Sequence, residues 1–511
     1  MKTLKVENQY QLCALNGEWL RRLKLNLNRM NTDEYSPVNV FKPLTYEWHG
    51  DWEGRTLLAL SCLEELFGED VVFSKDVWGK YVEHLNNGMY FGPVFDGASI
   101  NEQQFAGNSW FLRSLCNEYE KSQDTKLYER IKTVVYELYI KASNRFLNYP
   151  IDFNVAENGG IIGELNVSFE NWRISSDVGC LYISIDGLSH AYKIVKDPLL
   201  RGLIDKLIEM MNSTNVAEKN FQCHAFLSGI RGILRMGELI GEEYYKIAEE
   251  LFAYYLKDNV NGVYEGSGVI GKPAPSEGCA VIDSAMIAIR LYLWNKNEKY
   301  LSLYRKILVN AIEVNQRSNG GFGCNKYVGK ENPYLEILPE GKEAYWCCSM
   351  RGAEGLTDVV KHLYCAEEDV VELLTFADSE VLLWEGQTRI EQSTCYPRNG
   401  ETVLKIKTKR PFRLRIRALG NYELQLNGKP FADEISVEIG ESIWTLSMQA
   451  KKTEERFEGL FRYHLGDKVL CAKSEIVQGA NELIPLTDFS LLSMDDLDTI
   501  KIRTLFNCPL K

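Results

Sequence analysis

Residues 282–300 of the chain read Ile-Asp-Ser-Ala-Met-Ile-Ala-Ile-Arg-Leu-Tyr-Leu-Trp-Asn-Lys-Asn-Glu-Lys-Tyr. Ile282, Met286 and Ile289 fall on one face of a helix, because their spacing follows the helical period. The polar turn Asn295–Tyr300 ends this helix, and the next helix opens near a Tyr. A turn this short places consecutive helices antiparallel. Residues 282–300 therefore predict the beginning of a helical hairpin.

The same pattern recurs loosely up to about residue 366. Further polar turns lie at residues 121–128 and 241–245, and helical spacing is found again at Leu227, Ile230 and Leu234. About ten to twelve helices in such hairpins are typical of an (α/α) toroid, whose inner helices surround a cleft.

After about residue 370 the period becomes two. Alternation of apolar and polar residues predicts half-buried strands, and Asn427-Gly428 is a strong hairpin turn. The alternating segments are Val403–Thr408, Phe412–Arg417, Leu424–Leu426 and Ile435–Ile439. Short strands with no helix between them predict an antiparallel β-sandwich. We place the boundary within Cys365–Asp369, with a toroid domain over 1–366 and a jelly-roll-like β-sandwich over 367–511.

Composition excludes several classes of protein. With 45% hydrophobic and 25% charged residues, the 511-residue chain is globular. Its 58 Lys+Arg against 71 Asp+Glu give a net charge of −13, so we expect no nucleic-acid partner. No apolar run is long enough to span a membrane. The start of the chain lacks the apolar core of a signal peptide, and the 13 cysteines are odd in number and scattered, so we expect a reducing, cytoplasmic location.

Two short cysteine motifs could carry chemistry. Trp346-Cys347-Cys348-Ser349 has adjacent thiols, which ligate a metal, remain reduced in a core or form a vicinal disulfide. Glu277-Gly278-Cys279 follows an irregular segment and precedes a strong helix. Three thiolates and one carboxylate make a tetrahedral Zn²⁺ set, and a zinc-bound thiolate is deprotonated and can act as a nucleophile. The alternative is three unrelated core cysteines.

At these motifs the chain resembles the β-L-arabinofuranosidase-like glycoside hydrolases, family 127 and its relatives. Glu277-Gly-Cys-Ala280 resembles the family's Glu-x-Cys-Ala segment, and Trp346-Cys-Cys348 resembles its Cys-Cys segment. The resemblance covers roughly residues 100 to 475. Weaker likenesses lie at Cys223-His-Ala225, Gly268-Val-Ile-Gly271, Tyr396-Pro-Arg-Asn-Gly400, Arg413-Leu-Arg-Ile-Arg417 and Leu426-Asn-Gly-Lys-Pro430.

The resemblance implies an (α/α)6 barrel followed by β-sandwich domains, and hydrolysis of glycosides with retention. Carried over to this chain, it makes Cys347 the nucleophile, which attacks the anomeric carbon and gives a thioglycosyl enzyme. Glu277, Cys279 and Cys348 would complete the zinc site with Cys347, and His224 would lie near the sugar. The implied substrate is an L-arabinofuranoside or a related plant-wall sugar, including an acidic one.

The general acid is where the sequence departs from the family. Relatives carry an acid/base glutamate in a longer loop before Glu-x-Cys, and here that loop is cut to Lys272-Pro-Ala-Pro-Ser276. Glu277 itself would fall at the acid's position counted from the glycines, but we favour the ligand role. Glu265 and Glu343 are then candidate acids, and an ordinary surface carboxylate is the alternative for either.

Other residues are candidates for contact with substrate. Arg351 follows the Cys-Cys segment, where it could bind an acidic sugar, pair with Glu354 on its own helix or be solvated. Trp48, His49 and Glu53 belong to a cluster just before a helix expected at 55–66. In a toroid this cluster would lie at the cleft rim, with Trp stacking on a sugar; core packing is the alternative.

We interpret Asp283 and His190 as structural. The expected partner of the chain is an oligosaccharide or glycoside, and a homodimer is left open. Two further functions remain. One is another toroid enzyme, such as a uronyl hydrolase or sugar epimerase, although those enzymes need neither zinc nor paired cysteines. The other is a non-catalytic carbohydrate-binding protein with a structural zinc, which the shortened loop keeps open.

Overall fold

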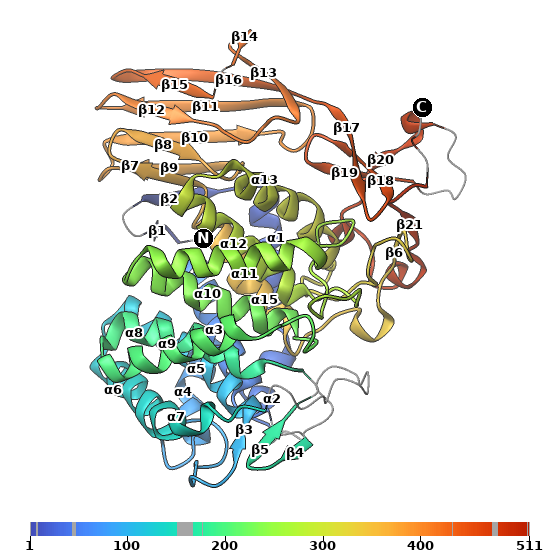
Figure 1. The fold of residues 1–511 in the computed structure, drawn as a ribbon. Coiled ribbons are helices and arrows are strands. Elements are labelled where there is room, and N and C mark those ends of the chain that lie inside the picture. The colour runs from blue at the N-terminus through green and yellow to red at the C-terminus, as the bar shows by residue number, and fades with distance from the viewer. Residues whose placement is uncertain are drawn as a thin grey trace.

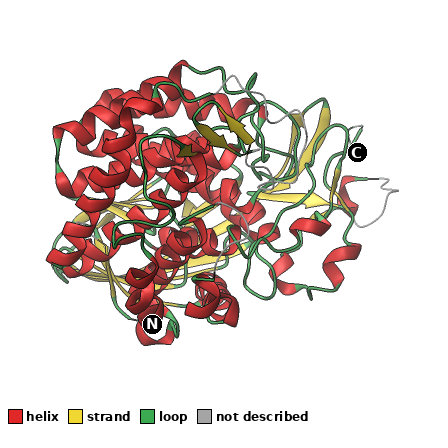
Figure 2. Ribbon diagram, turned by 90° about the horizontal axis from the view of Figure 1, so that it is seen from below, coloured by secondary structure: helices red, strands yellow, loops and turns green. Residues whose placement is uncertain are grey.

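The computed structural model describes residues 2–6, 9–42, 48–150, 167–175, 177–431, 433–472, 479–507 and 509. Helices make up most of the first part of the chain, and two sheets lie against one side of them, at the top of Figure 1. Seen from below, the strands of these sheets appear between and behind the helices (Figure 2). None of the helices in the described ranges combines the length and apolar character that crossing a membrane requires.

Six helices form a closed ring at the centre of the helical part. Each contacts the next, and the last, α15, returns to contact the first, α3. They are α3 (Asp51–Phe67), α5 (Glu102–Ser122), α8 (Ser184–Val195), α10 (Cys223–Leu239), α12 (Gly278–Asn295) and α15 (Cys348–Val360). An outer helix separates each from the next along the chain, so the six run in the same direction and begin at the same end of the ring.

Each outer helix packs against the inner helix that precedes it around the ring. In this order the outer helices are α4 (Ser74–Lys80), α6 (Thr125–Val134), α9 (Pro198–Ser213), α11 (Glu242–Asp258), α13 (Glu298–Lys306) and α1 (Gly17–Met30). Two of them continue through a π-helical turn: α6 through Val135–Ile140 into α7 (Lys141–Phe146), and α13 through Ile307–Ala311 into α14 (Ile312–Asn315). The polar turns recognised in the sequence join α5 to α6, α10 to α11 and α12 to α13, which confirms the (α/α)6 barrel.

Two sheets build the β-sandwich. One has the strand order β1-β2-β9-β10-β11-β16-β13-β14 and the other β15-β12-β8-β7. The first contains β9 (Ser379–Leu383), β10 (Thr388–Thr394), β11 (Gly400–Thr408), β16 (Gly440–Ala450), β13 (Tyr422–Leu426) and β14 (Lys429–Pro430), and the second β15 (Glu434–Val437), β12 (Phe412–Arg415), β8 (Val370–Leu373) and β7 (Tyr364–Glu367). Pairing is antiparallel as expected, except that β12 runs parallel to β8. Apolar side chains from both sheets, such as Val381, Leu404 and Leu414, are fully buried.

The start of the chain belongs to the sandwich sheet rather than to the toroid. Strands β1 (Leu4–Val6) and β2 (Tyr10–Leu15) extend the larger sheet, with β2 paired to β9. The hydroxyl of Tyr10 also donates to the carbonyl of Val360 at the end of α15, at 2.6 Å. The sequence places residues 4–15 in the toroid, because a β-strand this far from its partner leaves no local pattern. The domain boundary near residue 366 stays a prediction.

The last part of the chain forms a separate small sheet. Strands β17 (Lys452–Phe457), β18 (Leu460–Leu465), β19 (Lys468–Cys471) and β20 (Ile484–Pro485) pair in sequence order. Farther on, β21 (Ile502–Arg503) pairs with β6 (Tyr334–Leu335), a strand within the helical part. The sequence predicts that the sandwich continues to residue 511. In the structure, the region after 450 forms its own sheet and is bound to loops of the toroid (Figure 1).

The first two inner helices approach so closely that glycines are required between them. A Cβ on Gly107 of α5 would overlap backbone atoms of His49 and Asp51, just before and at the start of α3. Gly54 of α3 meets the backbone of Phe111 on α5 in the same way. Backbone atoms cannot move aside as a flexible side chain can, so these glycines set the distance between α3 and α5.

Gly107→Ala is therefore expected to lower the free energy of unfolding by about 1–3 kcal/mol, because the helices must separate to admit the methyl group. Gly79→Ala on α4 is the matched control: nothing lies within 4 Å of its Cβ position, and alanine favours a helix by about 1 kcal/mol over glycine. Urea unfolding of both variants checks this. Equal stability of Gly107→Ala and Gly79→Ala would contradict the close packing.

Candidate functional site

Four side chains gather at the end of the ring where the inner helices begin. The ligand atoms of Glu277, Cys279, Cys347 and Cys348 all lie within 4.8 Å of one another. The Sγ of Cys348 is 3.5 Å from the Sγ of Cys279 and 3.5 Å from that of Cys347. Glu277, Cys279 and Cys348 are buried, whereas Cys347 is only half-buried. The structure thus brings together the two cysteine motifs that the sequence singled out.

Helix starts position these side chains. Glu277 is the N-cap residue of α12, with Cys279 in its first turn, and Cys347 is the N-cap residue of α15, which begins at Cys348. Because α12 and α15 are neighbours in the ring, both N-termini point at the cluster. Gly278 allows the close approach, since a Cβ there would lie 3.1 Å from the Cβ of Cys348. The partial positive charge of helix N-termini stabilises thiolates and carboxylates.

The pKa values of the three thiols are shifted in different directions. Hydrogen bonds from the thiols of Cys279 and Cys348 hold the pKa of Cys347 well below its usual value, and the guanidinium of Arg55 lowers it further. Burial raises the pKa of Cys279 and of Glu277. Interactions with Cys279 and the other neighbouring thiols, reinforced by burial, raise the pKa of Cys348. Of the three thiols, Cys347 is therefore the one whose ionisation its surroundings favour.

This donor set fits a zinc ion. Sulfur ligands about 2.3 Å from zinc at a tetrahedral angle lie about 3.8 Å apart, close to the observed sulfur separations. Three thiols and a carboxyl group also carry more negative charge, once ionised, than Arg55 can balance. A divalent cation with a preference for sulfur would supply the balance, because a bound metal deprotonates its thiol ligands.

Gln222 holds the carboxylate of the cluster in place, and sequence reasoning missed it. Its Nε2 donates to Oε2 of Glu277 at 2.6 Å, while its Oε1 accepts from the backbone N–H of Ala225 at the start of α10. Such a second contact fixes the orientation of a metal ligand. The only sequence signal is its position at the N-cap of a helix.

Arg55 is a second residue that sequence reasoning missed. Its Nε donates to Asp51 at 2.8 Å, its Nη2 donates to Nε2 of His224 at 3.2 Å, and its guanidinium lies 4.4 Å from the ring centroid of Trp110. Its Nη1 is buried and has no hydrogen-bond partner among the described residues. Arg55 thus keeps one buried donor without a partner, and its positive charge lowers the pKa of Cys347. The Asp–Arg spacing of four residues in α3 is the signal that could have indicated it.

His224 is enclosed rather than open to solvent. Nδ1 donates to Oδ2 of Asp283 at 2.6 Å, Nε2 accepts from Arg55, and the ring stacks on Trp110. Burial and the neighbouring guanidinium of Arg55 lower the pKa of His224 well below its usual value, so it is neutral. Burial raises the pKa of Asp283 to about 7. His224 orients Arg55, and Asp283 fixes the tautomer of His224, in line with the structural interpretation of Asp283.

The contacts of both candidate acids favour structural roles. Glu265 is fully buried and accepts hydrogen bonds from Asn261, Ser276, Asn315 and Asn325. Glu343 accepts from Nε of Arg29 at 2.7 Å, from Asn319 at 2.7 Å and from Ser349 at 2.8 Å, which links α1 to α15. Both oxygens of each carboxylate already accept hydrogen bonds from the protein.

Arg351 is paired inside the ring. Its guanidinium binds Asp283 and Glu354, and only 2% of the side chain is exposed. Arg231 contacts the same two carboxylates at 3.2 and 2.8 Å, and Arg113 contacts Glu354 at 2.6 Å. Of the alternatives drawn from the sequence, this geometry favours the ion pair with Glu354 over contact with an acidic sugar.

The cluster before α3 lies beside the cysteines, together with aromatic residues from another segment. Trp48 and His49 are half-buried. Glu53 accepts the backbone N–H of Gly50 in a helix cap, and burial raises its pKa to about 7. The ring of Trp52 meets Tyr345 edge-on at 5.5 Å, and Tyr345 meets Trp346 at 5.1 Å.

Tyr345 and Trp346 immediately precede Cys347, and more than a third of each is exposed. Exposed aromatic rings beside the thiolate suit the apolar face of a sugar. From the sequence, Trp48 is the candidate for this role; the signal for Tyr345 and Trp346 is their position next to Cys347.

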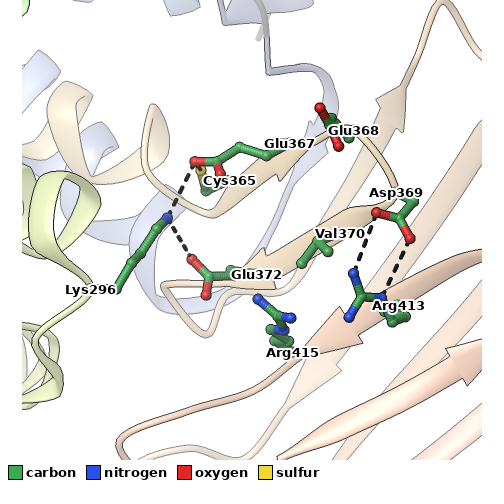
Figure 3. A pocket seen from close by; sticks show the side chains of 9 residues that line it. All are labelled: Lys296, Cys365, Glu367, Glu368, Asp369, Val370, Glu372, Arg413 and Arg415. Atoms are coloured by element: carbon green, nitrogen blue, oxygen red, sulfur yellow. Dashed lines mark hydrogen bonds and ion pairs between the residues drawn. The ribbon is translucent and has the colours of Figure 1, made fainter.

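A pocket of about 560 Å³ lies apart from this cluster, where the toroid meets the sandwich. Its charged side chains bind one another: Lys296 at the end of α12 contacts Glu367 at 3.3 Å and Glu372 at 2.9 Å, and Arg413 contacts Asp369 at 3.4 Å (Figure 3). These pairs join α12 to strands β7, β8 and β12. The pocket therefore belongs to the domain interface, and none of the sequence-predicted site residues lines it.

Solved structures of glycoside hydrolases share this fold. A GH127 β-arabinofuranosidase aligns with a TM-score of 0.64 and 13% identity over 91% of this chain and 84% of its own. The GH127 β-L-arabinofuranosidase of Geobacillus stearothermophilus T6 aligns with 0.57 and 14% over 90% and 86%. A further glycoside hydrolase gives 0.64 and 14% over 94% and 84%. No protein-family model and no curated protein matches the sequence. The resemblance to GH127 is thus confirmed at the level of the fold.

His190 gives the helical ring a dependence on pH. It accepts a hydrogen bond from Arg113 at Nδ1, at 2.7 Å, and its Nε2 lies 3.2 Å from Glu120. Burial, aided by Arg113, lowers the pKa of His190 from 6.5 to about 3. The unfolded chain therefore binds a proton below pH 6.5 that the folded chain rejects, and stability falls as the pH drops from 6.5 towards 3.

In His190→Gln, the amide can still accept from Arg113 and donate to Glu120, but it does not bind a proton in the folded or the unfolded chain. Between about pH 7.5 and about pH 5, the wild-type protein is expected to lose about 2 kcal/mol more unfolding free energy than the variant. Urea unfolding at the two pH values measures it. The exposed His84, replaced by Gln, is the control and should behave like the wild type. Equal losses in wild type and His190→Gln would show that His190 does not hold its neutral form.

Proposed function

We propose that the protein is a retaining glycoside hydrolase in which Cys347 attacks the anomeric carbon of a β-L-arabinofuranoside or a related plant-wall sugar. The observation that carries the proposal is the cluster of Glu277, Cys279, Cys347 and Cys348 at the N-terminal end of the helical ring. The GH127-like fold supports the class of reaction, and two of the structures with this fold are described as arabinofuranosidases.

Exposure and charge distinguish the nucleophile from the other ligands. Cys279 and Cys348 are fully buried, whereas Cys347 is half-buried and follows the exposed Tyr345 and Trp346. The thiol hydrogen bonds that lower the pKa of Cys347 make it the thiolate. A sugar approaching from solvent would therefore meet Cys347 first, as the anionic and most nucleophilic sulfur.

Glu277, Cys279, Cys347 and Cys348 would hold the zinc ion. When bound, zinc would keep all three thiols deprotonated and temper their charge. Gln222 orients Glu277, and the positive charge of Arg55 stabilises the thiolate of Cys347. Attack by Cys347 opposite the leaving group, followed by attack of water opposite the new C–S bond, gives two inversions and hence overall retention.

Zinc content tests the ligand set. The purified protein under reducing conditions should contain about one zinc ion per chain, and Cys279→Ser should lower its zinc affinity at least about tenfold, because one of four ligands becomes a weak one. Cys116→Ser is the matched control, since Cys116 is equally buried on α5 but is not one of the four clustered ligands. Elemental mass spectrometry after dialysis measures both. Zinc retained by Cys279→Ser, or lost from both variants, would contradict the ligand set.

Turnover tests the nucleophile. Cys347→Ser should reduce hydrolysis of an aryl β-L-arabinofuranoside by at least about 10³-fold, because a serine hydroxyl is not ionised at neutral pH. With excess zinc present, its melting temperature should stay near that of the wild type, because Cys347 is only half-buried and three ligands remain. Mass spectrometry of intact protein mixed with a slow substrate should show a glycosyl adduct on the wild type alone. A Cys347→Ser protein that keeps its activity would exclude Cys347 as nucleophile.

A further inference from the structure

A carboxyl group without a partner lies at the same end of the ring. Asp177 is in the loop between β5 (Trp172–Ile174) and the short helix Cys180–Ile183, and it is 7% exposed. Its carboxyl oxygens make no hydrogen bond or ion pair with the described part of the chain. A buried carboxyl group in this state is unusual, because burial of such a group normally requires a partner.

Ser175 and Val178, on either side of Asp177, are both held by hydrogen bonds. Ser175, two residues before it, accepts from Nε2 of Gln103 at 2.5 Å, and its backbone N–H donates to Glu102 at 3.1 Å. Val178, which follows it, accepts the backbone N–H of Gln222 at 3.0 Å. Gln222 is the residue whose side chain binds the ligand Glu277. One hydrogen-bonded connection therefore joins the loop of Asp177 to the cysteine cluster.

The charged groups nearest Asp177 are all acidic. Burial, reinforced by Glu102, Cys347 and Asp51, raises the pKa of Asp177 to about 7. Asp177 in turn contributes to the raised pKa of Glu277. Glu102 is fully buried and bound by Tyr149 and by backbone N–H groups, so it faces away from any substrate.

The other carboxyl groups near the cluster are committed. Asp51 pairs with Arg55, and Glu265 and Glu343 are held by the donors described above. Glu53 remains, but one of its oxygens caps α3, and its charged neighbour is Asp51 rather than Cys347. A group that gives a proton to a leaving oxygen at Cys347 must be free of other partners and must lie on the cluster's side of the ring. Asp177 has no side-chain partner among the described residues, and the residue after it is bonded to Gln222, which holds the ligand Glu277. Cys347 is also one of the groups that raise the pKa of Asp177.

We propose that Asp177 is the acid and base of the glycosidase reaction, in place of the glutamate that the shortened loop 272–276 lacks. This inference rests on the proposed function. In the first step the Cys347 thiolate forms the bond to the anomeric carbon, the glycosidic C–O bond breaks, and the proton of Asp177 goes to the leaving oxygen. In the second step Asp177 takes a proton from water, the water oxygen bonds to the anomeric carbon, and the C–S bond breaks to restore the thiolate.

Aryl β-L-arabinofuranosides with leaving phenols of graded acidity test this role. Asp177→Asn should lower kcat/KM by about 10²–10⁴-fold for the least acidic phenols and by less than about tenfold for a dinitrophenol, which leaves without a proton. The wild type should lose kcat/KM as the pH rises and Asp177 ionises, and this loss should be absent in Asp177→Asn. Asp177→Glu, which restores a carboxyl group, should recover part of the activity toward poor leaving groups.

Azide gives a second readout. In Asp177→Ala, azide needs no base to attack the thioglycosyl enzyme, so it should accelerate release of the sugar as a glycosyl azide with retained configuration. Zinc content and melting temperature should equal those of the wild type, as they should for Asp76→Asn, an exposed carboxyl change on α4 that should leave turnover unaltered.

The outcomes separate the two proposals. Three results would overturn the role of Asp177 alone. The first is an equal loss of kcat/KM for all phenols in Asp177→Asn, and the second is the absence of glycosyl azide with Asp177→Ala. The third is a leaving-group dependence that appears in Glu53→Gln and not in Asp177→Asn. Loss of zinc from Asp177→Asn would assign it to the metal site and overturn it as well. If the wild type cleaves none of the aryl glycosides, both proposals fall together.

Discussion

Closure of the helical ring is the constraint on which the rest of this structure depends. Cys279 and Cys348 are 69 residues apart in the chain, yet their sulfur atoms are neighbours because α12 and α15 stand side by side in the ring. The contact of α15 with α3 then brings Arg55 to the same place. A ring whose inner helices all begin at one end collects six N-termini there, and that end favours negative charge. The anionic cluster and the positive helix ends are therefore two parts of one electrostatic arrangement.

Carboxyl groups inside the ring differ in pKa according to the charged groups next to them. Along the axis, Arg231, Arg113 and Arg235 outweigh the cost of burial and hold the pKa of Asp186 low, so this part is a network of fixed ion pairs. At the N-terminal end, Arg55 is the cation that the cysteines and Asp51 share, and carboxyl groups there keep their protons more readily. Ion pairs thus stabilise the interior of the ring, and groups able to exchange protons lie at the end where the inner helices begin.

Much of the fold, and the cysteine cluster, can be predicted from local sequence patterns. Helical periodicity and short polar turns were enough to predict the hairpins, because inner helices must bury one face against the ring. The Glu277–Cys279 and Cys347–Cys348 motifs, taken together and with the family resemblance, indicated the cluster, although each motif alone is also compatible with core cysteines. The sequence could not indicate Arg55, Gln222 or Asp177, whose importance lies in partners brought close by the ring. It also assigned the first strands to the toroid, since β2 pairs with β9 across most of the chain.

That last pairing has a consequence for how the protein is made. During synthesis β1 and β2 emerge before the toroid, but their partner β9 emerges only after every helix of the toroid has been synthesised. During that interval two strands with buried apolar residues such as Leu12 have an unpaired edge. Their docking is a late event that closes a very long loop of chain. Two segments from either side of the toroid in the chain therefore meet in one sheet, so the sandwich is completed only when both are present.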